Sequence, residues 1–188
     1  TLFRERDLKG DALTSYTVLK SILNGKIEIV YCKSGKEITD EIKNKDSVIV
    51  DAIFGTGFKG APDGRLKTIF ESINSLKNII VSLDSPSGFY SYDQESVCIN
   101  PSATLMMGVR KFHSMFYKGK EVCGKTELIN IGIDQSEFTG YNTRKIFRTD
   151  VSDIKYMLPV RKINSYKYAN GKVLILSGSK GLTGATFL

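Results

Sequence analysis

Two aspartates stand where short apolar runs give way to glycine-containing turns. Asp51 follows residues 47–50 and Asp84 follows residues 79–83, and both runs have the continuous apolar character of strands buried on both faces. A carboxylate at such a place costs free energy unless it meets a cation, a hydrogen-bond donor or solvent. Capping of the following turn explains either aspartate alone. Two such aspartates on neighbouring parallel strands predict a shared site at the carboxyl ends of those strands.

The turn after Asp51 has the composition of an anion-binding loop. It contains Gly55, Thr56, Gly57, Phe58, Lys59, Gly60 and Ala61. Glycines let backbone N–H groups converge on a phosphate, and Lys59 adds a positive charge. The turn is not a Walker loop, because no Gly-Lys-Ser/Thr ends it. It matches the spacing of a dinucleotide-binding fingerprint, but Pro62, Asp63 and Gly64 delay the helix that should follow at once.

The turn after Asp84 offers a second oxygen ligand. Pro86 restricts the backbone there, and the hydroxyl of Ser87 lies close to Asp84 in the sequence. Ser87 is not expected to act as a nucleophile, because His113 is the single histidine and no base partner is evident. The alternative interpretation of this turn is a capped β-turn.

The apolar spacing predicts strands and helices that alternate along the chain. Helices are expected at 11–23, 38–42, 66–76 and 151–158, strands at 26–32, 47–50, 79–83, 103–107 and 126–131, and a loop at 135–142. This alternation predicts an α/β fold with a doubly wound, mostly parallel sheet. Residues 172–176 form a further apolar run, followed by a glycine-rich turn. We interpret this run as the first strand of a second domain.

The bulk composition excludes several classes of protein. The chain has 188 residues, of which 41% are hydrophobic and 25% charged, and no apolar run is long enough to cross a bilayer. Its three cysteines are too sparse for a disulfide framework and favour a reducing, cytoplasmic location. The net charge of +7 is interpreted as a solvated, lysine-rich surface, so neither a nucleic-acid nor a membrane partner is expected.

The paired motifs around Asp51 and Asp84, in this order, resemble NAD(P)H-hydrate epimerase, a Rossmann-like domain. The resemblance extends over residues 13–134 and includes Gly108-x-x-Lys111. Residues 166–167, 171–179 and 183–185 are similar to the opening of a ribokinase-like, ADP- or ATP-dependent NAD(P)H-hydrate dehydratase, which is often fused to the epimerase. The resemblance therefore implies an epimerase domain at 1–145, and at 146–188 a linker with the start of a truncated ribokinase-like α/β domain.

The resemblance also implies an activity and roles for individual residues. The family repairs NADH and NADPH that have gained water: the epimerase interconverts the R and S hydrates, and the dehydratase removes water from the S form. By matching position, Asp51 and Ser87 would bind potassium, residues 55–61 would wrap the substrate phosphates, and Asp84 would be the acid–base residue at the nicotinamide end. Thr183, Gly184 and Ala185 would belong to the substrate loop of the dehydratase, which uses ADP or ATP with magnesium. A homo-oligomer is left open.

The chain also departs from the family pattern. The glycine-rich motif Asn-Asn-Gly-Gly-Asp-Gly does not occur between Thr1 and Val50, Ser85 stands where Ile or Val is usual, and Tyr166 stands where His is usual. We therefore expect an incomplete fragment that is inactive when made alone. Two alternatives stay open: a non-catalytic nucleotide-binding or protein-interaction module of the same fold, and a fragment of a ribokinase-like kinase.

Overall fold

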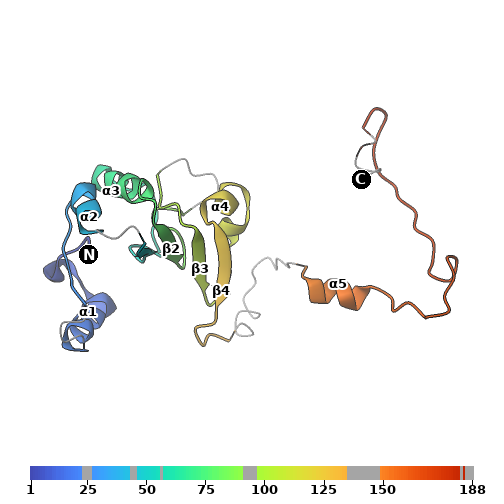
Figure 1. The fold of residues 1–188 in the computed structure, drawn as a ribbon, viewed down its shortest axis with the longest axis horizontal. Coiled ribbons are helices and arrows are strands. Elements are labelled where there is room, and N and C mark those ends of the chain that lie inside the picture. The colour runs from blue at the N-terminus through green and yellow to red at the C-terminus, as the bar shows by residue number, and fades with distance from the viewer. Residues whose placement is uncertain are drawn as a thin grey trace. The chain divides into compact units, whose positions relative to one another are not determined.

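A parallel four-stranded sheet is the centre of the first of two compact units. The computed structural model describes residues 1–22, 27–42, 46–55, 57–90, 97–134, 149–182 and 184. The units are Thr1–Gly140 and Tyr141–Leu188. In the first, strands β1 (Val48–Asp51), β2 (Ile79–Leu83), β3 (Ala103–Met107) and β4 (Lys125–Ile129) lie side by side in that order (Figure 1). All pairs are parallel, which confirms the predicted Rossmann-like α/β fold.

Short helices precede and connect these strands. They are α1 (Gly10–Ile22), α2 (Gly35–Glu41), α3 (Gly64–Asn74) and α4 (Tyr117–Val122), with 3-10 turns at Glu5–Asp7 and Phe112–Met115. Asp63 begins α3, because its carboxylate accepts a hydrogen bond from the Leu66 N–H at 2.8 Å. Ser34 caps α2 in the same way. In the second unit, Asp150 caps α5 (Val151–Met157), so the helix predicted at 151–158 is confirmed.

The core lies on one face of the sheet, under α3. Helix α3 contributes Ile69, Phe70 and Ile73, which cluster with Ile80 of β2. Buried residues on the same face of the sheet include Ser82, Thr104 and Met106. Strand residues alternate between the two faces, so their neighbours point to the opposite one. There Val48, Val50 and Ile79 are 56%, 57% and 58% exposed. We call these three residues the open face. They leave an apolar surface in contact with solvent.

Arg65 on α3 connects two segments that lie outside the sheet. Its guanidinium donates to the carbonyl oxygens of Leu2 at 3.1 Å, Cys32 at 3.3 Å and Lys33 at 3.0 Å. The segment 27–32 also accepts a hydrogen bond from the amino group of Thr1 and returns one from the Cys32 N–H to the Thr1 carbonyl. These bonds replace the ladder that a strand neighbour would supply.

Two predicted strands are wrong. The described residues 27–32 form no strand: Val30 and Cys32 bond to Thr1 and Cys32 accepts from the Arg65 side chain, but no described strand runs beside the segment. Residues 172–176, which we interpreted as the first strand of a ribokinase-like domain, are extended but belong to no sheet, and four of their side chains are 62–89% exposed. A buried parallel strand needs neighbours on which to pair, and no described residue pairs with this run.

Candidate functional site

Asp51 is the buried centre of a polar cluster at the carboxyl end of β1. The residue is only 3% exposed. Its Oδ1 accepts from the Ser87 hydroxyl at 2.5 Å and the Ile53 N–H at 3.3 Å. Its Oδ2 accepts from the Ser82 hydroxyl at 2.7 Å and the Ser87 N–H at 2.9 Å. The structure thus brings Asp51 and Ser87 together, and hydrogen bonds compensate the buried carboxylate on both oxygens.

Ser87 joins the turn after β2 to the turn after β1. Besides contacting Asp51, its hydroxyl oxygen accepts from the Phe54 N–H at 2.9 Å and lies 3.3 Å from the Phe54 carbonyl oxygen. A carboxylate, a hydroxyl and a backbone carbonyl therefore meet in one small volume. Oxygen donors of these three kinds are those that hard cations prefer. The residues present fit the potassium ion that the resemblance implies.

Asp84 follows β2 directly, in a conformation that few non-glycine residues adopt. Its φ is +69°, in the left-handed region, and its N–H donates to the Leu105 carbonyl at 2.8 Å. The carboxylate is 20% exposed, and its Oδ1 lies 2.7 Å from Nζ of Lys111. A Cβ atom on Gly55 would stand 3.3 Å from Oδ2 of Asp84. The first glycine of the predicted anion loop thus lies against this carboxylate.

Most of the other described residues of the loop are open to solvent. Gly57, Lys59, Gly60 and Ala61 are exposed, whereas Phe58 is half-buried and stacks on Phe54 with ring centroids 4.6 Å apart. Thr56 lies outside the described residues. Gly60 has a φ of +87°, which suits glycine, and no atom lies within 4 Å of a Cβ built on it. The space around Gly57 and Gly60 is therefore open.

Lys111 belongs to the site but did not stand out in the sequence as a functional residue. It follows β3 by four positions, and its Nζ also donates to the Met107 carbonyl at 3.0 Å. His113 lies close by and packs against the ring of Phe89. Burial lowers the pKa of His113 below its usual value; Lys111 lowers it further, and Asp84 opposes that shift. The signal for Lys111 was its place after the third parallel strand, at the edge where such strands collect ligands.

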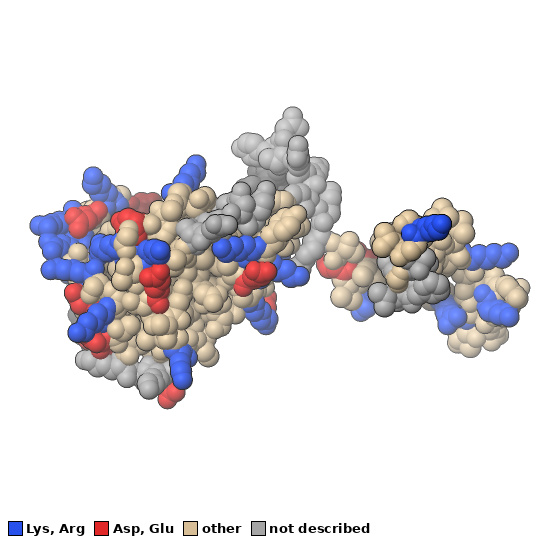
Figure 2. Space-filling model, turned by 90° about the horizontal axis from the view of Figure 1, so that it is seen from above, with Lys and Arg blue, Asp and Glu red and all other residues tan. Residues whose placement is uncertain are grey.

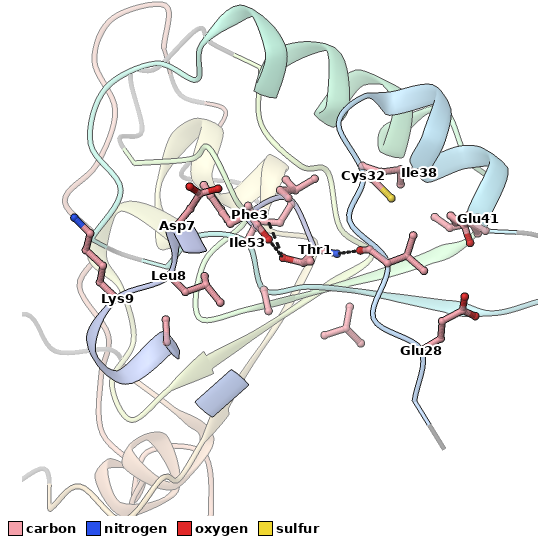
Figure 3. A pocket seen from close by; sticks show the side chains of 16 residues that line it. Thr1, Phe3, Asp7, Leu8, Lys9, Glu28, Cys32, Ile38, Glu41 and Ile53 are labelled. Atoms are coloured by element: carbon pink, nitrogen blue, oxygen red, sulfur yellow. Dashed lines mark hydrogen bonds between the residues drawn. The ribbon is translucent and has the colours of Figure 1, made fainter. Parts of the chain in front are cut away.

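A separate groove lies beside the edge of the sheet. It has a volume of about 820 Å³, and the described residues of the turn after β1 that line it are Ala52 and Ile53. Figure 3 shows Phe3, Cys32 and Ile38 around it, together with the hydrogen bond from the amino group of Thr1. Neither Asp51 nor Asp84 lines this groove. It is therefore distinct from the cluster at the strand ends.

The surface of the larger unit carries charges of both signs. On the viewed face of the larger unit, Lys and Arg are interspersed with Asp and Glu (Figure 2). Among the described residues, no three His, Cys, Asp or Glu side chains gather as a metal cluster would, and no helix is long and apolar enough to cross a membrane. Of the predicted dehydratase loop, Gly184 is exposed, and Thr183 and Ala185 lie outside the described residues.

Comparison with known proteins identifies the family. The sequence signature described as "YjeF-related protein N-terminus" matches residues 2–112. The chain belongs to this family. The matched region includes both aspartates, the glycine loop, Ser87 and Lys111.

Three named relatives are similar to this chain in sequence. The chain is 31% identical over 189 residues to the "Bifunctional NAD(P)H-hydrate repair enzyme Nnr" of Moorella thermoacetica, a match that covers 100% of this chain and 35% of the relative. The protein of the same name from Methanocaldococcus jannaschii is 31% identical, with coverage of 98% and 34%. The "NAD(P)H-hydrate epimerase" of Elusimicrobium minutum is 29% identical, with coverage of 62% and 54%. The chain thus spans about a third of the length of the bifunctional relatives.

Proposed function

We propose that this chain forms an NAD(P)H-hydrate epimerase site, which interconverts the R and S hydrates of NADH or NADPH. The observation that carries the proposal is the position of the Asp84 carboxylate. One of its oxygens faces Gly55 of the glycine loop, and the other is paired with Lys111. A partly exposed carboxylate next to a phosphate-type loop suits a substrate that has phosphates at one end and a reacting ring at the other. The names of the relatives support the same substrate class.

Asp84 is the proposed acid–base residue of this reaction. Inversion at C6 of the hydrated nicotinamide ring moves a hydroxyl group through an iminium-like species, so a proton must be delivered to oxygen and later removed. The carboxylate of Asp84 can do both, because it is partly exposed at the edge of the sheet. Residues 55–61 would bind the substrate phosphates through backbone N–H groups, with Lys59 adding charge.

Asp51 and Ser87, together with the Phe54 carbonyl, are the proposed ligands of a potassium ion. The ion would supply positive charge beside the glycine loop, where the substrate phosphates are negative. Within the chain, Asp51 and Ser87 also tie the turn after β1 to the turn after β2. They thus hold the loop and Asp84 in register with one another.

A second candidate function is a non-catalytic nucleotide-binding module of the same fold. The observation that favours it is the hydrogen bonding of Asp51, whose two oxygens are satisfied by Ser82, Ser87 and Ile53 without a cation. Such a cluster holds the two turns together whether or not chemistry follows. Either function fits a reducing compartment, since Cys32, Cys98 and Cys123 are free thiols.

The second unit carries a further proposal that rests on resemblance alone. Thr183, Gly184 and Ala185 would contribute to a dehydratase site that uses ADP or ATP with magnesium to remove water from the S hydrate.

An epimerisation assay distinguishes the candidates. Mixed R and S hydrates are supplied with potassium, and conversion is followed by chromatography. The 188-residue chain is compared with a hybrid in which this sequence replaces the matched segment of the Moorella relative. We expect conversion by the hybrid and a loss of about 10²-fold in kcat for its Asp84→Asn variant. A hybrid that binds the hydrates but converts them no faster than buffer would support the binding module instead.

A further inference from the structure

We propose that Lys111 is a positioning residue for this site: its ammonium holds Oδ1 of Asp84 and thereby sets the orientation of the whole carboxylate, with Oδ2 toward Gly55. This inference rests on the proposed function and adds a residue to it. Lys111 lies on the segment after β3, whereas Asp84 follows β2 and Gly55 follows β1. Three consecutive strands therefore contribute to the arrangement.

The ion pair is short and partly buried. Lys111 Nζ and Asp84 Oδ1 are 2.7 Å apart, and their side chains are only 13% and 20% exposed. By contrast, the pair Lys125–Glu127 spans 3.2 Å with side chains that are 78% and 54% exposed. Solvent and salt screen a partly buried pair less than an exposed one, so the Lys111 pair is the stronger constraint.

Lys111 is itself anchored at a second point. Its Nζ donates to the carbonyl oxygen of Met107, the last residue of β3, at 3.0 Å. The ammonium is therefore tied to the rigid end of a central strand as well as to Asp84. A cation held at both points cannot follow the carboxylate if its side chain rotates. It therefore selects a single orientation for that carboxylate.

The backbone of Asp84 is also fixed, so the orientation of its carboxylate is determined at both ends of the side chain. Its left-handed conformation, with a φ of +69°, is unfavourable for a non-glycine residue and persists only where its surroundings enforce it. The N–H bond to Leu105 fixes the backbone, and Lys111 fixes Oδ1. The other oxygen, Oδ2, is then the one that faces Gly55 and the proposed phosphate loop. Proton transfer requires this kind of alignment between the reacting groups.

The test compares Lys111→Met, Lys111→Arg and a matched control, Lys125→Met, which removes the exposed ion pair. Each variant is assayed for R-to-S conversion in the form of the protein that is active, either the chain or the hybrid. For Lys111→Met we expect kcat to fall at least about 10-fold while KM changes less than about 3-fold. Lys111→Arg should recover most of the loss, and Lys125→Met should match the parent. An unchanged kcat in Lys111→Met would overturn the inference. So would a fall in kcat that is accompanied by an equally large rise in KM and by a lower melting temperature.

A second measurement keeps this inference separate from the proposed function. The carboxyl carbon of Asp84 is observed by ¹³C NMR in the 188-residue chain, assigned by its loss in Asp84→Asn. Its signal should move in Lys111→Met and stay in place in Lys125→Met. If the protein converts no hydrate but shows this shift, the proposed reaction is wrong and the contact between Lys111 and Asp84 is still supported. If the signal does not move, Lys111 does not contact Asp84 and the inference is wrong.

Discussion

At the scale of single residues, the two aspartates have different surroundings although both end a strand. Asp51 is buried and its oxygens accept hydrogen bonds from Ser82, Ser87 and Ile53. Asp84 is partly exposed and meets an ammonium on one oxygen. Proton exchange with a ligand needs access, whereas a structural or metal-binding carboxylate needs donors or a cation. The surroundings thus favour Asp84 for chemistry and Asp51 for organisation of the turns.

The hydrogen bonds of Asp51 lead to a stability prediction. In Asp51→Asn, the amide nitrogen replaces one acceptor oxygen, so at least one buried donor from Ser82 or Ser87 loses its partner. We expect the free energy of unfolding to fall by about 1–3 kcal/mol, measured by denaturant titration. Asp63→Asn is the control, because asparagine caps a helix about as well as aspartate and should leave stability nearly unchanged. Equal midpoints for both variants would contradict the role assigned to Asp51.

His113 predicts a dependence of stability on pH. Its pKa is lowered in the folded protein, chiefly by burial and by Lys111, so the unfolded chain binds more protons as pH falls below about 6.5. The contribution of this residue to stability is therefore complete above that pH and declines below it. His113→Gln should show a smaller loss of stability between about pH 6.5 and 5 than the parent chain, measured by thermal melts in matched buffers. Parallel curves would show that His113 titrates alike in both states.

At this scale the sequence predicted which residues meet but not how each one is held. Asp51, Gly55, Asp84 and Ser87 were expected at one edge of the sheet, because parallel strands present their carboxyl ends together. The contact between Lys111 and Asp84 depends on the left-handed turn at Asp84, and nothing in the residue types around it specifies that turn. The roles of these residues in binding and catalysis stay predictions.

At the scale of elements, continuous apolar runs were sufficient for the central strands but not for isolated ones. The strand predicted at 103–107 is confirmed with the same bounds, because it has β2 and β4 on either side. Residues 27–32 and 172–176 have similar apolar content and form no strand. Pairing partners, which a local pattern cannot specify, decide between these outcomes.

The turn after β2 contains a glycine that the packing requires. Gly88 has a φ of +89°, and a Cβ atom there would lie 2.7 Å from Cε2 of Phe70. Gly88→Ala should lower the free energy of unfolding by about 2–4 kcal/mol, through backbone strain and overpacking together. Gly60→Ala is the matched control: its φ is +87°, but its Cβ would meet nothing within 4 Å, so about 1 kcal/mol is expected. Equal losses in the denaturation midpoint would show that backbone strain alone is responsible.

At the scale of the whole molecule, the open face and the edge of the sheet are uncovered together. Strand β1 is the edge strand of the described sheet, and two of its four residues belong to the open face. An edge that is both unpaired and apolar is a template for association with another chain. We therefore expect the 188-residue chain to self-associate at concentrations where a covered sheet would stay monomeric.

A charge on the open face tests this expectation. Val50→Lys should shift the chain toward monomer in sedimentation velocity experiments, because a solvated ammonium opposes contact between two apolar faces. Val151→Lys is the control, since Val151 is 68% exposed but belongs to α5 in the second unit and is no part of the open face. If both variants associate as the parent chain does, association does not proceed through the open face.

Arg65 has a consequence for the order in which the folded chain opens. Because one guanidinium binds carbonyl groups on either side of α1, the segments around Leu2 and Cys32 share an anchor. Release of that anchor frees both at once, so their amide protons should exchange with deuterated solvent at correlated rates. The N-terminal third would then behave as a single cooperative unit of local opening, separate from the slower-exchanging strands.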